Sequence, residues 1–122
     1  MAGILRALRV FGASVSMTWL TMACGGAALP QQELTSAEAA VRAAEVAGAP
    51  AVPKAELHLK YARDQITQAK QMIEQGENEQ AQRVLVKAES DAEVALALAK
   101  HEEARSEANK ALEDIEALME KK

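Results

Sequence analysis

The chain has 122 residues, enough for one domain, and 49% of them are hydrophobic although only 2% are aromatic. Alanine, leucine, glutamate, lysine, glutamine and arginine dominate and all favour helices, so we expect an all-α fold whose thin, alanine-lined interfaces leave little room for a substrate cavity. The formal net charge of −4, with no clustered basic face, argues against nucleic acid as a partner.

The N-terminal residues 1–23 have the pattern of a secretory signal peptide. Arg6 and Arg9 supply a positive start, residues 10–20 form an apolar stretch, and small residues follow from Ala23 onwards. The apolar stretch is far shorter than the ~20 residues that a membrane-spanning helix needs. We therefore predict that this segment directs export and is then removed.

The only cysteine, Cys24, follows this segment directly. The sequence LTMACGG (residues 20–26) resembles the lipobox of bacterial lipoproteins, with Ala23 as the small residue before the cysteine and Thr21 where an aliphatic residue is usual. The resemblance implies that Cys24 is acylated and anchors the protein to a membrane, and the glycine after it is compatible with the outer membrane. The alternative is an unmodified thiol in a signal that is cut downstream, for instance after Ala28.

The first part of the mature chain is predicted to be a flexible tether over residues 24–34, because it carries glycine, proline and glutamine without periodicity. A short first helix is expected over residues 36–47. Thr35 and Glu38 match a capping box, in which the side chain of each residue accepts a hydrogen bond from the backbone N–H of the other. Gly48 is the natural end of this helix.

A second helix is predicted over residues 53–75, with Pro53 at the first helical position, where its missing N–H costs nothing. Its apolar residues repeat at alternating spacings of three and four, which is the pattern of a helix that packs along one seam. The seam residues of this helix are Leu59, Ala62, Ile66, Ala69 and Ile73.

A tight reversal is predicted at Gly76, with Asn78 as the cap of a long third helix over residues 78–120. A short connection makes the two helices antiparallel neighbours. The expected fold is therefore an antiparallel αα-hairpin with a short extra N-terminal helix and a long C-terminal helix. The matching seam residues of the third helix are Ala81, Leu85, Ala88, Ala92 and Ala95.

Beyond residue 100 the apolar stripe of the third helix changes register. The old and new stripes overlap in residues 92–99, which are apolar around nearly the whole helix, so we expect the first helix to cover part of them. The third helix is also too long for the second to cover, so its last part should protrude and meet a partner or a second copy. The predicted interface residues are Ala104, Ala108, Ala111, Ile115 and Leu118.

Residues 36–100 resemble the bacterial family catalogued as domain of unknown function 4398. The resemblance rests on a proline shortly before Ala-Glu-Leu (55–57), on Ala62-Arg63 and Ala69, on Gly-Glu-Asn-Glu-Gln-Ala (76–81) and on Ala-Glu-Ser-Asp-Ala (88–92). Members of that family are small, alanine-rich envelope proteins, often lipoproteins. The resemblance implies a place and a fold, and it brings no catalytic residues.

The residue patterns give no candidate for catalysis, for a metal or for a cofactor. The only histidines, His58 and His101, both lack the glutamate three residues earlier that bundle metal sites use. No phosphate-binding glycine loop or nucleophile elbow is present, so we expect neither an enzyme nor a small-molecule substrate. Ser90 and Asp91 are predicted to lie on an exposed helix surface.

Three functional hypotheses follow from these patterns. The leading one is a lipid-anchored, non-catalytic interaction or oligomerisation module on the periplasmic face of the bacterial envelope. The second is a structural spacer joined to peptidoglycan through the C-terminal Lys122, because a terminal lysine resembles that of the major outer-membrane lipoprotein; the two terminal lysines could equally complement the helix dipole. The third, which the histidine spacing disfavours, is a metal-binding helical bundle.

Overall fold

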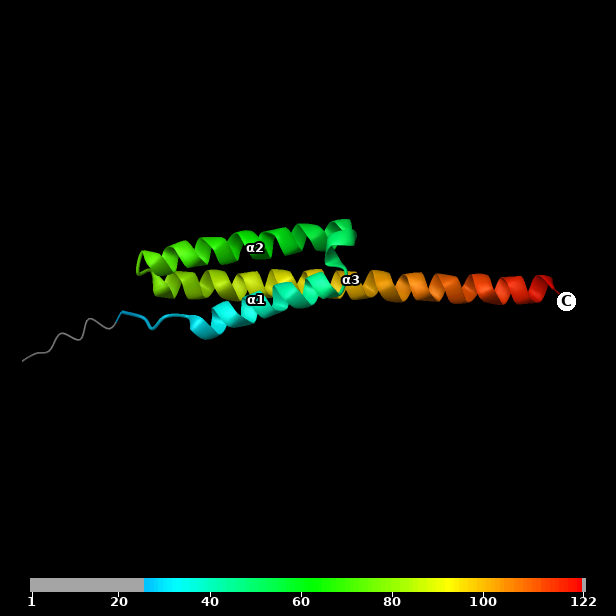
Figure 1. The fold of residues 1–122 in the computed structure, drawn as a ribbon, viewed down its shortest axis with the longest axis horizontal. Helices are drawn as coiled ribbons and strands as arrows, with labels where there is room; N and C mark the ends of the chain where they lie inside the picture. The colour runs from blue at the N-terminus through cyan, green and yellow to red at the C-terminus, as the bar shows by residue number, and fades with distance from the viewer. Residues whose placement is uncertain (1–25, 122) are drawn as a thin grey trace, which may run out of the picture.

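The computed structural model of the chain describes residues 26–121 (Figure 1). It contains helix α1 (Gln31–Val46), a short 3-10 turn η1 (Ala49–Ala51), helix α2 (Pro53–Glu74) and helix α3 (Asn78–Glu120), and no strand occurs within this range. The all-α fold predicted from the sequence is confirmed.

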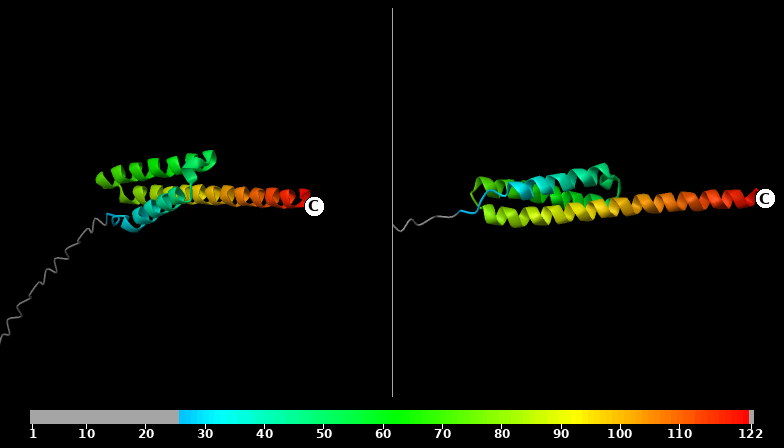
Figure 2. Two further views of the ribbon diagram at one scale, coloured as in Figure 1. Left: turned by 45° about the vertical axis from the view of Figure 1, so that its right-hand side comes forward. Right: turned by 90° about the horizontal axis from the view of Figure 1, so that it is seen from below.

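The three helices pack side by side over only the first half of α3. Helix α2 runs antiparallel to α3, and α1 runs parallel to α3 on a different side (Figures 1 and 2). Beyond about residue 100 no other element of the described chain accompanies α3, and every residue from His101 to Lys121 is exposed. We call residues 101–120 the overhang, and the end of the molecule at the α2–α3 turn the hairpin pole.

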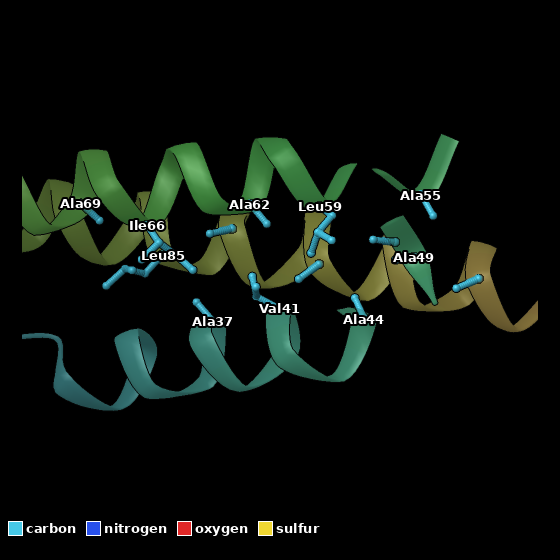
Figure 3. Close-up of a cluster of buried hydrophobic side chains, with 14 of the residues drawn as sticks. Ala37, Val41, Ala44, Ala49, Ala55, Leu59, Ala62, Ile66, Ala69 and Leu85 are labelled. Atoms are coloured by element: carbon cyan, nitrogen blue, oxygen red, sulfur yellow. The ribbon is translucent and has the colours of Figure 1, made fainter. Parts of the chain in front are cut away.

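The core is built mainly from alanine. Of the fifteen buried hydrophobic residues, eleven are alanine, and the largest fully buried side chains are Leu59 and Leu85 (Figure 3). Small side chains let the helix axes come close together, but each contributes little buried area, so the two leucines matter most to stability.

The seam positions named from the sequence lie between the helices. Nine of the ten are buried, and Ile73 in the last turn of α2 is half-buried against the same core. Ala55 and Ala99 extend the seam at its other end. The α2–α3 hairpin therefore forms along the alanine, leucine and isoleucine ridges that the spacing predicts.

The reversal at Gly76 is also where the sequence predicts it. Gly76 has a φ of +80°, a left-handed conformation that glycine adopts without strain. Its N–H donates to the Ile73 carbonyl at 3.0 Å, and the Glu77 N–H donates to the Met72 carbonyl at 2.8 Å. These two bonds form a Schellman motif, which satisfies the last carbonyls of α2.

Asn78 does not cap α3 as predicted. Instead, its Nδ2 donates to the carbonyl of Ala27 at 2.7 Å, and no side chain caps this helix start. The bond ties the segment that leads into α1 to the hairpin pole.

The start of α1 corrects the predicted boundary at residue 36. The helix begins at Gln31, and Thr35 lies inside it, where its hydroxyl donates to the Gln31 carbonyl at 2.8 Å. Residues 31–34 are thus helical rather than part of a tether. The physical reason is tertiary: Pro30 is buried at the helix start and Leu34 packs against the core, which outweighs the local capping signal.

Candidate functional site

Helix α3 carries two apolar seams on nearly opposite faces. The inner seam contains Ala92, Ala95 and Ala99 and is buried against α1 and α2. The outer seam is defined here as the α3 positions spaced three and four residues apart from Val94 to Leu118. Each outer position lies two residues after an inner one where the seams overlap, and two residues turn an α-helix by about 200°.

The outer seam is open to solvent along its whole length. Val94 is 41% exposed at its start, and Ile115 and Leu118 are 52% and 69% exposed near its end. The predicted interface residues all lie on it and are all exposed: Ala104, Ala108, Ala111, Ile115 and Leu118. They share one face of the overhang, and nothing within residues 26–121 covers that face.

Two further apolar residues widen this surface, and neither is among the interface residues predicted from the sequence. Leu112 and Met119 are 59% and 66% exposed and lie on one flank of the outer seam. Each directly follows a seam residue, Ala111 or Leu118, so a search for a strict three-and-four spacing passes over both. An apolar residue beside a seam position was the available signal.

The step where α2 begins beside α3 forms an open hollow of about 550 Å³. Its apolar lining comes from Val52, Pro53 and Leu98, and His101 and Arg105 stand on its α3 side. The hollow adjoins the base of the overhang on the same flank as Leu112. It is a wide surface depression, unlike the enclosed cavities that bury small ligands.

The main polar cluster between helices joins α2 to α3. His58 Nδ1 lies 3.0 Å from Asp91 Oδ1, and Gln65 Nε2 donates to Asp91 Oδ2 at 2.7 Å. The rings of His58 and Tyr61 meet edge to face at 6.1 Å. The prediction that Asp91 lies on an exposed surface is wrong, because its side chain is only 18% exposed. An aspartate within a helix-surface run gives no sequence signal of a partner 33 residues away.

The environment of Asp91 favours its ionised form. Partial burial acts to raise the pKa of this carboxyl, but the hydrogen bonds from Gln65 and His58 outweigh it and hold the pKa below its usual value. These contacts join α2 to α3, and we call the cluster of His58, Gln65 and Asp91 the clasp. The other interhelical ion pairs, such as Lys70 with Glu38 at 2.8 Å, are largely exposed and stabilise little.

The other sites predicted from the sequence fall in two groups. The predicted signal peptide (1–23), Cys24 and Lys122 lie outside the described residues. Within residues 26–121, no group of three or more histidine, cysteine, aspartate or glutamate side chains is close enough together to hold a metal ion. None of the helices in that same range combines the length and apolar character needed to span a membrane.

Comparison with known proteins adds one match. The family model described as a domain of unknown function (DUF4398) matches residues 32–121. This range begins one residue into α1 and includes the whole overhang. No curated protein and no solved structure matches the chain.

Proposed function

This chain belongs to the DUF4398 family, and we propose that it is a non-catalytic, lipid-anchored protein of the bacterial cell envelope that uses the outer seam of α3 as a helical interaction surface. The observation that carries the proposal is the overhang itself. Most helices in proteins are stabilised by the packing of an amphipathic face, yet α3 continues for about twenty residues with an apolar face that nothing in the described chain covers. A contiguous exposed apolar face on a small protein is typical of a binding surface.

The position of the leading segment supports anchoring at the hairpin pole. The bond from Asn78 to Ala27 fixes the chain entry beside the α2–α3 turn, and the C-terminal end of α3 lies at the opposite end of the molecule (Figure 1). Only two residues lie between Cys24 and Ala27 in the sequence, so acyl chains on Cys24 would hold the membrane near this pole. The overhang at the other end then stays free for a partner on the periplasmic side of the outer membrane.

Site-specific crosslinking in living cells tests the interaction surface. A photoreactive amino acid at Ala108 should give a crosslinked product of higher mass, whereas the same group at Lys110, about 200° further round the helix, should not. Absence of any product at Ala108 contradicts the proposed surface.

The anchor has a separate test. Protein extracted from the membrane fraction should have the intact mass of a chain that begins at Cys24 and carries acyl groups, and Cys24→Ser should abolish that species. A chain that begins after Ala28 without lipid would contradict the anchor and leave the interaction surface standing.

A spacer role is the second candidate, because the two ends of the described chain lie at opposite poles of a rod about 65 Å long, the length of the 43-residue α3. A peptidoglycan link through Lys122 should then release bound protein only after the cell wall is digested. Lys122→Ala should remove that fraction, and an intact chain with no wall-bound fraction ends this candidate.

A further inference from the structure

The residue sizes along the outer seam are arranged unevenly. Its middle is small, with Ala104, Ala108 and Ala111, and its larger side chains lie towards the two ends, with Val94 and the polar His101 on one side and Ile115 and Leu118 on the other. A helix that packs on this seam at an even distance must place small residues where the seam is large, because facing positions have to fill a constant gap.

A second copy of α3 meets this requirement when it runs antiparallel. Full overlap of the two seams places Leu118 of one copy opposite Val94 of the other, Ile115 opposite Ala97, and Ala104 opposite Ala108. In a parallel pair every residue faces itself. The four alanine layers, Ala97 among them, would draw the axes together, whereas the Ile115 and Leu118 layers would push them apart. The antiparallel register therefore fits the seam better.

The charged residues that flank the seam favour the same arrangement. In this register Lys100 of each copy lies beside Asp114 of the other, which gives two attractive pairs related by the two-fold axis. In a parallel pair Lys100 would lie beside Arg105 of the second copy, which is repulsive. Arg105 and Glu107 each meet their own counterpart near the antiparallel axis, and these two like-charged contacts are the cost of the register.

In the antiparallel register the second copy also covers the apolar flank that contains Leu112. Leu112 of one copy comes opposite Leu98 of the other, and Leu98 is a half-buried residue in the lining of the hollow beside Pro53. The hollow of one copy and Leu112 of the other therefore lie at the same level along the pair.

From this agreement of sizes, charges and flanking residues we propose that the occupant of the outer seam is a second copy of this chain, paired antiparallel through residues 94–118. The proposal rests on the interaction function above and names its partner. The contact is isologous, so it closes at a dimer. The two hairpin poles lie at opposite ends of this dimer, so two anchors reach one membrane only if the dimer lies along its surface.

Sedimentation equilibrium of the full chain carrying Cys24→Ser, with charge-swap variants, tests the proposal. We expect a dimer, a roughly tenfold weaker association for Lys100→Glu, and recovery in the double variant Lys100→Glu/Asp114→Lys. Lys110→Glu is the matched control, because it makes the same charge change on the polar face of the overhang and should leave the association unchanged. Circular dichroism checks that each variant keeps its helix content.

Two outcomes overturn the proposal. Tighter association of Lys100→Glu indicates a parallel pair, in which the new glutamate meets Arg105 of the second copy. A chain that stays monomeric up to about 1 mM rules out the second copy altogether. If the monomeric chain still crosslinks through Ala108 in cells, the interaction function survives with a different protein as its partner.

Discussion

The two halves of α3 are one continuous helix in two different environments. Over residues 78–99 its inner seam is buried by α1 and α2, whereas over residues 101–120 every side chain is exposed. The two halves contain the same kinds of residue, since alanine, leucine and charged side chains dominate both. What separates them is the face of the helix on which the apolar residues lie.

A shift of two residues in the apolar pattern produces this difference. It moves the seam about 200° around the helix, so the overhang directs its apolar face away from the side where α1 and α2 lie. On the inner side the overhang carries residues such as Glu103, Ser106 and Glu113, so the three-helix packing could not have continued there. The stability of the first half therefore comes from packing within the chain, and that of the second half comes from helix propensity, to which the proposed partner would add.

Truncation of one leucine in each half should give the largest contrast. Leu85→Ala removes a fully buried side chain and should lower the free energy of unfolding by about 2–5 kcal/mol, because it leaves a cavity among alanines that cannot collapse. Leu118→Ala removes an exposed side chain and should cost less than about 0.5 kcal/mol. Urea denaturation of dilute protein, followed by circular dichroism, measures both; equal losses would show that the overhang is packed within the monomer.

Enlargement of an alanine should show the same asymmetry, although it makes the opposite change in side-chain volume. Ala92 is fully buried where the helices are close, so Ala92→Leu should destabilise the fold by about 1–3 kcal/mol through overpacking. Ala108→Leu adds the same atoms to an open face, where leucine is as good a helix former, and should leave the unfolding free energy of the monomer unchanged within about 0.5 kcal/mol. A tolerated Ala92→Leu would mean that the inner seam is looser than its alanines indicate.

Acid should weaken the paired half through Asp91. The pKa of this carboxyl is lower in the folded chain than in the unfolded one, so its contribution is present above the unfolded pKa and is lost as the pH falls through the folded pKa. We expect the unfolding free energy to decline below about pH 4, and Asp91→Asn to cost about 1–2 kcal/mol at neutral pH while flattening that decline. Glu107→Gln on the overhang is the control. A pH profile unaltered by Asp91→Asn would exclude the clasp as a stabilising element.

The sequence was sufficient to predict the features of the fold that depend on helical periodicity and on the conformation of turn residues. The three-and-four spacing of Leu59, Ile66 and Leu85 identifies the residues that meet between α2 and α3, because an alanine-rich helix has few other ways to bury apolar area. Gly76 marks the turn because its left-handed conformation suits glycine. The uncovered stripe of the overhang likewise follows from counting the residues of the second and third helices.

The features that escaped prediction depend on contacts between distant segments. The local sequence marks Thr35 as a cap, but with Pro30 buried α1 begins five residues earlier than that cap would start it. The local sequence marks Asn78 as the cap of α3, but in the fold its side-chain amide donates to the carbonyl of Ala27 instead. Asp91 looks exposed until the hairpin brings His58 and Gln65 to it. In each case a tertiary partner, absent from the local sequence, decides the outcome.

Removal of the overhang should have the smallest effect on the monomer and the most informative one. A chain that ends at Lys100 keeps the whole buried core, so its free energy of unfolding in dilute solution should match that of the full chain within about 0.5 kcal/mol. At protein concentrations well above the dissociation constant the full chain alone should gain stability, by about 2.7 kcal/mol at a hundredfold excess, because association stabilises only the folded state. Thermal unfolding of both chains across a concentration series measures this gain. A difference that does not change with concentration would mean that the overhang stabilises its own hairpin, and the division of α3 into a packed half and a binding half would then be wrong.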